Sequence, residues 1–591
     1  MSSGKNEKTG SSKAARKRKD RAAEVANTFE WLITAFVLAF VFRAFVMEAF
    51  RIPTGSMANT LKGAHFRLRC PQCGYRYDHG FPTRNDDFIP PGNVPLPVTR
   101  CPSCGYYPSR LLCRTCGRIY DSDSIAKKNK LHQNINSSSN TAAMPYRCPR
   151  CNGYLLLTDK EMPVANGDRI LVLKCIYQFF QPKRWDIIVF KNPLDPTENY
   201  IKRLIGLPEE KVEIIDGDIY INDRISRKPP KVQDNLWMPV YDNDYQPVWP
   251  REGSFNGHRW RQPFKNDRGS KWIVGDKANP TLFRLDSPAD QINTLVYNTS
   301  NDKDFKATYA YNEVDVRREK ELPFCSDLRV RFYADSSNRQ GRIGIELSKY
   351  GTHYRAWVDL TGEMVITKDE QGKKTIELKR KPIHLPAAGK PTLVRFANVD
   401  HQLIFEFGSE KLTYDLGSGP GDAGPIKTDA EPQVKIFGAG KLTLSHIVIF
   451  RDIHYTRYRL GDNHTPGRAT QDHPFPLSED EFFVLGDNSP NSEDGRWWNR
   501  PGMANNGLSY REGIVPRDYL VGKALFVYWP SGFEFPWPKS LKTFLSKNSR
   551  YNRLSTVAHW IVSLRWIPNV GQMRFIYGGS SKKSARICNG E

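Results

Sequence analysis

Acidic residues are scarce in this 591-residue chain: 64 Asp and Glu stand against 87 Lys and Arg, which leaves a formal net charge of +23. The sequence also contains no legible nucleic-acid-binding module, so we expect no nucleic-acid partner despite the basic balance. The same charge suits contact with anionic lipid head groups. Apolar and aromatic residues are not lacking, at 39% and 12%, so the chain can bury sizeable cores in about three or four domains.

Long uninterrupted apolar runs are also scarce, and the clearest one lies near the amino end. Residues 1–28 are polar and basic with almost nothing to bury, which predicts a disordered arm. Residues 29–50 come next, uninterrupted over 31–42 and then broken by Arg43 and Glu48. A membrane span needs about 20 mostly apolar residues, so we expect a transmembrane anchor with Arg43 reaching toward an interface. The positive-inside rule then leaves residues 1–28 in the cytoplasm and the rest of the chain on the outer side of the cell membrane.

A cleaved signal peptide is the alternative interpretation of residues 29–50, because the length of the apolar run would fit one. No convincing small-x-small cleavage site lies after the run, so we favour an anchor that is retained. A second, amphipathic run at 556–577 is broken by Arg565 and Pro568. It predicts a surface or interfacial helix, within a basic tail at 546–591, rather than a second span.

Short strands bounded by turn residues dominate three separate stretches, at 51–62, 164–224 and 481–545. Alternation and composition predict strands at 167–174, 184–190, 200–207, 211–221, 483–485 and 520–528. Asp216-Gly217, inside the fourth of these, is typical of a hairpin turn. Together the three stretches predict a mainly β core.

A strand-rich insertion occupies residues 225–480. Its apolar runs, such as 328–332, 354–360, 392–396, 403–407 and 442–450, are separated by turn residues at fairly even spacing. This pattern predicts a β-sandwich, and it looks similar to the concanavalin-like jelly rolls. No residue singles out a ligand, so a carbohydrate and a partner protein both stay open.

The other insertion, 63–163, contains four Cys-x-x-Cys pairs: Cys70/Cys73, Cys101/Cys104, Cys113/Cys116 and Cys148/Cys151. Repeated pairs with a glycine close behind are typical of zinc-ribbon knuckles, and eight thiolates can bind two tetrahedral zinc ions. We therefore expect up to two structural zinc ions. One hypothesis combines the first pair with the fourth and the second with the third. Disulfides are the alternative, which a location outside the cytoplasm would encourage.

A serine and a lysine of the β core have chemically suggestive settings. Ser56 lies in Pro-Thr-Gly-Ser-Met-Ala at 53–58, and Lys202 lies in Tyr-Ile-Lys-Arg-Leu-Ile-Gly-Leu-Pro at 200–208. A serine hydroxyl needs a base to become a nucleophile. A lysine can serve only when it is neutral, and burial among apolar residues lowers its usual pKa of about 10.4. Taken alone, each residue also has an ordinary interpretation, a turn serine and a solvated strand lysine.

Three stretches, in this order behind an apolar anchor, resemble the type I signal peptidases, the membrane serine proteases that remove signal peptides. They are residues 52–57, residues 200–208, and Gly-Asp-Asn-Ser at 486–489 together with Ser-Glu-Asp-Gly-Arg at 492–496. Residues 184–190 resemble a further strand of the family, with Trp185 in place of a glycine. The resemblance covers roughly 200 of the 591 residues, in pieces and outside both insertions.

The resemblance implies a Ser/Lys dyad in which Ser56 is the nucleophile and Lys202 is the general base. Thr54 and the backbone N–H of Ser56 would form the oxyanion hole. Ser492 would orient the lysine amine. Asp494 and Arg496 would stabilise the 486–496 loop by forming an ion pair, and Asp487 would have a further supporting role.

The implied substrate is the signal peptide of a secretory precursor, cut at the membrane surface after small residues. Shallow apolar pockets lined by Ile52, Ile187 and Val189 would accept those residues. The resemblance implies no cofactor for catalysis. The sequence departs from the family at Asn59, where a proline is usual, and at Glu209-Glu210, where Gly-Asp is usual. Neither change removes a catalytic group, but both bear on local loop shape.

Two other functions are compatible with parts of the sequence. A membrane-anchored binding protein with a zinc-ribbon, a lectin-like module and an inactive peptidase core is one, although Ser56 and Lys202 are both present. A related self-cleaving repressor protease is the other, and the apolar anchor and the 487–496 stretch count against it. The hypothesis that we favour is a signal peptidase with two large insertions.

Overall fold

The computed structural model of the chain describes residues 10–81, 93–97, 99–106, 111–113, 119–120, 150–151, 155–157, 161–247, 260–298, 304–312, 321–336, 340–370, 372–459, 465–503, 509–530 and 569–579. Beyond one long helix near the amino end, the regular structure of these residues is almost entirely β. The prediction of a mainly β chain is therefore confirmed.

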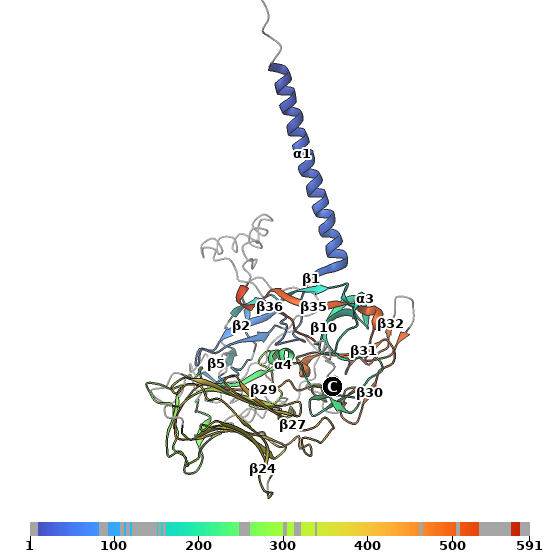
Figure 1. Cartoon of the computed structure of the whole chain (residues 1–591). Coiled ribbons are helices and arrows are strands. Elements are labelled where there is room, and N and C mark those ends of the chain that lie inside the picture. Colours follow the sequence, from blue (N-terminus) through green and yellow to red (C-terminus); the bar gives the residue numbers. More distant parts are fainter. Residues whose placement is uncertain are drawn as a thin grey trace, which may run out of the picture.

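The long helix α1 (Gly10–Val41) projects away from the body of the molecule, with strand β1 (Met47–Arg51) at its foot (Figure 1). A short π-helical turn, Phe42–Val46, joins the two. The prediction of a disordered arm is wrong over residues 10–28, which continue the helix of the apolar run in the amino-terminal direction. The stretch Glu24–Val46 has a mean hydropathy of 1.9 and is not buried by the rest of the protein, so its length and composition suit a single membrane span.

The carboxyl end of the anchor differs from the prediction of 29–50. Residues 47–50 belong to β1, which pairs with β9 (Arg169–Leu173) from Met47 opposite Leu173 to Arg51 opposite Arg169. Glu48 forms an ion pair with Lys174 at 3.1 Å. One of the two charges that interrupt the apolar run, Glu48, thus has a partner directly after β9, and the chain at this point already belongs to the β core.

The core sheet has the antiparallel order β1-β9-β35-β10-β11-β31-β34, with β36 also pairing with β35. Its further strands are β10 (Ile187–Asn192), β11 (Asp195–Gly206), β31 (Glu481–Leu485), β34 (Val515–Pro516), β35 (Leu520–Trp529) and β36 (Arg574–Phe575). Ile187 and Val189 of β10 pack into one apolar cluster, while Ile188 and Phe190 pack into another. The sheet is therefore buried on both faces at this strand, as side-chain alternation requires.

A smaller sheet continues from β11, in the order β14-β13-β12-β30. Its strands are β12 (Lys211–Ile215), β13 (Asp218–Ile221), β14 (Arg224–Ile225) and β30 (Phe475–Pro476). Asp216 and Gly217, with φ of 45° and 85°, form the predicted hairpin turn between β12 and β13. Because β30 pairs with β12, the chain has returned from the second insertion to the core before residue 480.

The second insertion is a two-layer β-sandwich, at the end of the molecule opposite α1 (Figure 1). One layer has the order β17-β18-β29-β20-β25-β26-β27, with β15 also pairing with β29, and the other has the order β16-β19-β28-β21-β22-β23-β24. The strands are β15 (Met238–Asp242), β16 (Phe264–Asn266), β17 (Ile273–Val274), β18 (Phe283–Asp286), β19 (Asn293–Tyr297), β20 (Leu328–Ser336), β21 (Arg342–Lys349), β22 (Thr352–Asp359), β23 (Glu363–Glu370), β24 (Ile376–Pro382), β25 (Thr392–Val399), β26 (Gln402–Phe407), β27 (Glu410–Asp415), β28 (Val434–Ala439) and β29 (Lys441–Arg451). Inward residues of both layers share one apolar core. The sandwich is as predicted, and its likeness to the concanavalin-like jelly rolls stays a prediction.

The cysteine-rich insertion contributes two small sheets. One has the order β3-β2-β8-β4, from β2 (His65–Arg69), β3 (Arg76–Gly80), β4 (Asn93–Pro95) and β8 (Glu161–Ala165). The other has the order β6-β5-β7, from β5 (Leu111–Cys113), β6 (Ile119–Tyr120) and β7 (Leu155–Leu157). Cys70, Cys101 and Cys104 are buried in the apolar cluster of the first sheet.

The helix predicted at 556–577 is wrong over its described end. Residues 569–577 form a 3-10 turn at Val570–Gln572 and then strand β36, which pairs Phe575 with Phe526 of β35. The two rings lie 5.0 Å apart, centroid to centroid. Pro568 ends the helical pattern, and β36 pairs instead with the part of β35 that extends beyond β10. The earlier part of the run lies outside the described residues.

Candidate active site

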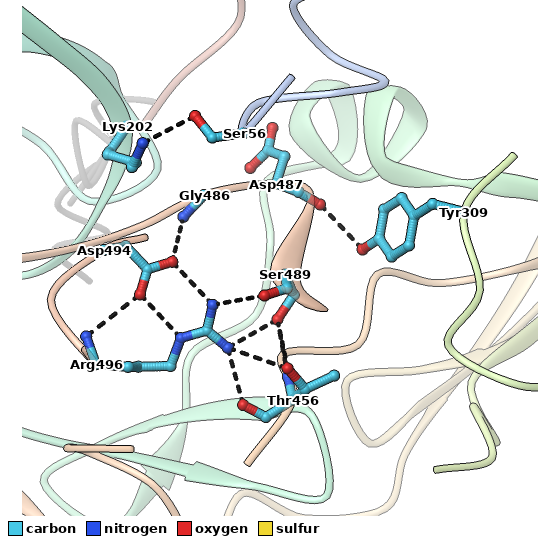
Figure 2. Close-up of polar contacts among 9 residues, drawn as sticks. All are labelled: Ser56, Lys202, Tyr309, Thr456, Gly486, Asp487, Ser489, Asp494 and Arg496. Carbon is cyan, nitrogen blue, oxygen red and sulfur yellow. Dashed lines mark hydrogen bonds and ion pairs between the residues drawn. The ribbon is translucent and has the colours of Figure 1, made fainter. Parts of the chain in front are cut away.

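Ser56 and Lys202, 146 residues apart in the chain, meet at hydrogen-bond distance. Ser56 lies in the loop after β1, and Lys202 lies on β11 (Figure 2). The Lys202 Nζ is 2.8 Å from the Ser56 Oγ. Only 5% of Lys202 is exposed, and this burial lowers the pKa of its amine to about 8, although the charges of Asp494 and Glu493 oppose the shift. A lysine with such a pKa is neutral in part at physiological pH and can accept a proton.

Arg203, next to the lysine, points to the other face of β11 and forms a buried ion pair. Its Nε and Nη2 donate to the two carboxylate oxygens of Asp487, at 2.7 and 2.6 Å. The sequence predicted a supporting role for Asp487, but not that Arg203 is its partner. The signal for this pairing was the position of Arg203 on a buried strand, because a buried guanidinium needs a carboxylate partner.

Asp494 and Arg496 form a fully buried ion pair, at 2.8 Å. The same Asp494 carboxylate accepts a hydrogen bond of 2.9 Å from the backbone N–H of Gly486. The Arg496 guanidinium also donates to the Thr456 carbonyl and to the Ser489 hydroxyl, each at 2.8 Å (Figure 2). This network holds the loop after β31 in one conformation, because its charged groups are buried and have hydrogen-bond partners.

Ser492 is buried, but its hydroxyl makes no hydrogen bond within the described part of the chain. A Cβ on Gly486 would lie 2.1 Å from the Ser492 Oγ, so only glycine fits beside it. The expected contact between Ser492 and the lysine amine is thus not formed in this structure. The role of Ser492 stays a prediction.

Two asparagines that the sequence did not single out complete the nucleophile loop. The Asn488 backbone N–H donates to the Ser56 carbonyl, and its side-chain amide donates to the Gly55 carbonyl, each at 3.0 Å. The Asn488 side chain in turn pairs with Asn312, from the second insertion. No local pattern could have revealed a contact between residues 176 positions apart.

The remaining predicted site residues differ in exposure. Thr54 is exposed, two residues before Ser56. Ile52, Ile187 and Val189 are brought together in one apolar cluster, but each is at most 2% exposed. They therefore form the packed layer beside the nucleophile loop, and their role in lining a substrate pocket stays a prediction.

Glu210, in the stretch that departs from the family, forms an ion pair with Arg184. Glu210 accepts hydrogen bonds from both terminal nitrogens of Arg184, at 2.8 and 2.6 Å, and from the backbone N–H of Leu207. Its longer side chain fixes the turn after β11, so this departure does not leave Arg184 unpaired.

The cysteine pairs combine differently from the hypothesis drawn from the sequence. The Sγ atoms of Cys70, Cys73, Cys101 and Cys104 all lie within 4.8 Å of one another, so the first pair joins the second and not the fourth. The separations Cys70–Cys104 and Cys73–Cys101 are 3.6 Å. That is close to the edge of about 3.8 Å expected of a tetrahedron with Zn–S bonds of about 2.3 Å. It is far longer than a disulfide bond of about 2.05 Å.

Cys151, from the fourth pair, corrects the predicted ligand set. It is exposed and does not belong to the four-cysteine cluster, so its predicted place beside Cys70 and Cys73 is wrong. The reason is that Cys101 and Cys104 already complete a tetrahedral set of four thiols, which leaves no position for a fifth. The Cys113 side chain, Cys116 and Cys148 lie outside the described residues, so a second zinc ion stays a prediction.

Comparisons with known proteins relate parts of the core to a family of serine peptidases. The family model described as "Signal peptidase, peptidase S26" matches residues 154–252 and 452–529. These segments include Lys202, Asp487, Asp494 and Arg496, while Ser56 lies before them. Over these parts the chain is related to the type I signal peptidases.

Curated relatives carry the same description. "Probable signal peptidase I-2" of Synechocystis sp. (strain ATCC 27184 / PCC 6803 / Kazusa) is 28% identical over 125 residues, which are 18% of this chain and 54% of the relative. "Signal peptidase I" of Rickettsia typhi (strain ATCC VR-144 / Wilmington) is 57% identical over 44 residues, which are 7% of this chain and 17% of the relative. The chain thus spans about half or less of the length of these relatives.

Solved structures match the chain only weakly. Galectin LEC-6 of Caenorhabditis elegans aligns with 22% of this chain and 87% of its own, at 12% identity and a TM-score of 0.17. The carbohydrate-binding module CBM66 of Bacillus subtilis aligns with 32% of this chain and 92% of its own, at 10% identity and a TM-score of 0.19. Likeness at this level says nothing of a ligand, and a carbohydrate or protein ligand of the sandwich stays a prediction.

Proposed function

We propose that the chain is a membrane-anchored signal peptidase, a serine endopeptidase with Ser56 as nucleophile and Lys202 as general base. The observation that carries the proposal is the 2.8 Å contact between the Ser56 hydroxyl and a buried lysine amine whose pKa is lowered to about 8. The family match to the core segments supports the same reaction.

The first half of the reaction forms an acyl-enzyme. The neutral Lys202 amine takes the hydroxyl proton as the Ser56 Oγ attacks the scissile carbonyl carbon, which gives a tetrahedral oxyanion and a lysine ammonium. When the C–N bond breaks, the ammonium returns that proton to the leaving amine. The carboxyl-terminal product departs, and the signal peptide stays bound to Ser56 as an ester.

The second half repeats the proton transfers with water. Lys202, neutral again, accepts a proton from a water molecule that attacks the ester carbonyl. The ammonium then protonates the departing Ser56 Oγ, which restores the hydroxyl and releases the signal peptide as a carboxylic acid. In both halves the Ser56 backbone N–H and the Thr54 hydroxyl would donate to the oxyanion, each contributing on the order of 3 kcal/mol.

The location of the dyad suits a substrate at the membrane surface. Ser56 lies ten positions beyond the carboxyl end of the apolar stretch at Val46, with β1 and residues 52–55 between them. The proposed substrate is the cleavage region of a secretory signal peptide, with small residues at the cut. In this arrangement the amino end lies in the cytoplasm and the core sheet outside it, as the basic arm predicts.

The test is cleavage of a signal-peptide substrate with a small-x-small site by the full chain in detergent. Wild type should cut after the small residue, whereas Ser56→Ala and Lys202→Met should lower kcat/KM by about 10⁴-fold or more, with circular dichroism unchanged. Equal cleavage by all three proteins would exclude the dyad. A folded wild type without activity would favour the alternative of an inactive binding protein.

We also propose that Cys70, Cys73, Cys101 and Cys104 hold one structural zinc ion. The four thiol groups are the ligand set of a closed tetrahedral site, which would stabilise the first insertion and leave no open position for catalysis. Metal analysis should show that Cys101→Ser loses about one zinc per chain. Cys175→Ser, at a half-buried cysteine outside the cluster, should keep the wild-type zinc content. Equal zinc in both variants would contradict this site.

A further inference from the structure

Residues 304–312, which we call the support segment, connect the sandwich to the candidate nucleophile loop. They lie in the second insertion, between the two stretches that the signal peptidase family model matches. The segment therefore belongs to this chain's own elaboration of the core. Its contacts nevertheless reach the loop that carries Ser56.

The contact with the nucleophile loop passes through Asn488. The Asn312 amide donates to the Asn488 Oδ1 at 2.8 Å, and the Asn488 Nδ2 donates to the Asn312 Oδ1 at 2.6 Å. The second hydrogen of the Asn488 Nδ2 is given to the Gly55 carbonyl. Both side-chain amides are thereby fixed in one orientation, because each amide donates to the other and accepts from it.

Two tyrosines of the support segment add further contacts. The Tyr309 hydroxyl donates to the Asp487 carbonyl at 3.0 Å (Figure 2). Burial raises the pKa of Tyr309, so the hydroxyl stays protonated and remains a donor. The Tyr311 hydroxyl donates to the Ala64 carbonyl at 3.0 Å, and its ring lies so close to Gly55 that a Cβ there would be 2.3 Å from it. The segment thus contacts both sides of the nucleophile loop.

The support segment is itself held from two directions. Phe305 is buried in the sandwich core, and the Arg451 guanidinium at the end of β29 donates to the Thr308 carbonyl. The cysteine-rich insertion holds the other side, where the Gly80 backbone N–H donates to the Tyr311 carbonyl at 2.7 Å. The position of the segment is therefore set by both insertions together.

We infer that the support segment is a positioning element for catalysis, and that Asn312 acts through Asn488 to hold the Ser56 loop in reach of Lys202. This inference rests on the proposed function, since it names a support of the same site. Small displacements of a nucleophile are costly: a shift of about 1 Å can lower a rate by about 100-fold. Asn312 touches no substrate in this scheme, so its loss should act on kcat and not on KM.

The experiment measures signal-peptide cleavage by full-length Asn312→Ala, Asn488→Ala and the double variant in detergent. Asn312→Ala should lower kcat roughly 10- to 100-fold and leave KM unchanged. In the Asn488→Ala background the same substitution should have little further effect, because the two side chains act in series. Additive losses in the double variant would overturn the path through Asn488.

Asn293→Ala is the matched control. Asn293 is a fully buried asparagine of the same sandwich. Its amide donates to the Gln291 carbonyl and accepts from the Lys271 backbone N–H, and neither partner belongs to the nucleophile loop. It should destabilise the sandwich comparably and keep the wild-type kcat. If Asn312→Ala and Asn293→Ala have the same kcat, the segment has a merely structural role and the inference is wrong.

Amide hydrogen exchange separates this inference from the proposed function. The peptide covering residues 52–62 should exchange faster in Asn312→Ala than in wild type and Asn293→Ala, with or without substrate. If wild type proves inactive but residues 52–62 still exchange faster in Asn312→Ala than in wild type, the positioning contact is supported while the proposed function fails. Unchanged exchange, with wild-type activity intact, would overturn the inference alone.

Discussion

Lys202 in the core sheet and Lys349 in the sandwich are both almost completely buried, with 5% and 1% exposed, but their neighbours differ. Among the described residues, Lys202 has no carboxylate within ion-pair distance and contacts the Ser56 hydroxyl. Lys349 contacts the carboxylate of Asp327 closely and lies 3.6 Å from that of Asp218. Burial lowers the pKa of Lys202, whereas the carboxylates, which outweigh burial, raise that of Lys349.

The difference shows that burial alone does not make a lysine a base. Asp218, Asp327 and Asp400 are close enough to one another to resemble a cation site, and the Lys349 ammonium contacts two of them. Lys228 completes the cluster by contacting Asp400 closely and Asp452 at 2.8 Å. There the lysines are cations that join the sandwich to β13 of the core, whereas no carboxylate in the described part of the chain pairs with Lys202.

The largest expected effect comes from replacing each lysine by arginine. A guanidinium keeps its proton even when buried, so Lys202→Arg should lower kcat/KM by about 10⁴-fold, whereas Lys349→Arg should retain activity because it still offers a cation to Asp327. Cleavage assays on the two proteins would decide this. Comparable activity in both would mean that Lys202 is not the base.

Replacing each lysine by methionine should separate stability from activity. Lys349→Met leaves buried carboxylates without a partner and should cost about 3–5 kcal/mol of unfolding free energy. Lys202→Met removes a buried cation that has no counter-ion, so the stability of that variant should equal or exceed wild type. Urea unfolding of both variants measures the difference. A similar loss in both would show that the two environments are energetically alike.

The pH dependence of cleavage should follow the protonation of the Lys202 amine. Because Lys202 acts only when neutral and its pKa is about 8, kcat/KM should rise up to that pH. Below it, the activity should fall by about tenfold per pH unit. A profile that stays flat from about pH 6 to 9 would contradict a lysine base.

The smallest expected effect is at the rim of the site. Glu493 is 54% exposed and its charge raises the pKa of Lys202, so Glu493→Gln should move the acid limb of the profile to lower pH. Salt should reduce the difference, since an exposed charge is screened. A shift to higher pH, measured at low ionic strength, would be inconsistent with the electrostatic argument.

Much of the core could be predicted because its information is local. The strands that flank Lys202 alternate or run apolar, and Asp216-Gly217 specifies its own turn. The buried setting of Lys202 is encoded in its apolar neighbours in sequence. The end of the anchor could not be predicted from composition alone, since β1 is defined by its pairing with β9.

The rest depends on contacts that no local pattern encodes. Each Cys-x-x-Cys pair is evident in the sequence, but which two pairs share a cluster depends on how the folded insertion brings their loops together, and Cys151 was misplaced for that reason. Asn312 and Asn488 are ordinary residues until the sandwich is folded against the core. The sequence therefore pointed to Ser56 and Lys202, which lie in contact, but not to the pairing of Asn312 with Asn488.

Because β35 lies late in the sequence, the candidate site can assemble only after most of the described chain has been synthesised. Strands β1 and β9 lie beside the serine loop, and β11, next to β10, carries the lysine. Among the described strands of this sheet, only β35 joins β9 to β10. A nascent chain therefore cannot close this sheet until Trp529 has left the ribosome. At about 5–20 residues per second, that comes on the order of half a minute or more after Ser56 is made. Both insertions have been translated by then, so the sheet that brings Ser56 and Lys202 together closes only after the cysteine-rich insertion and the sandwich have been made.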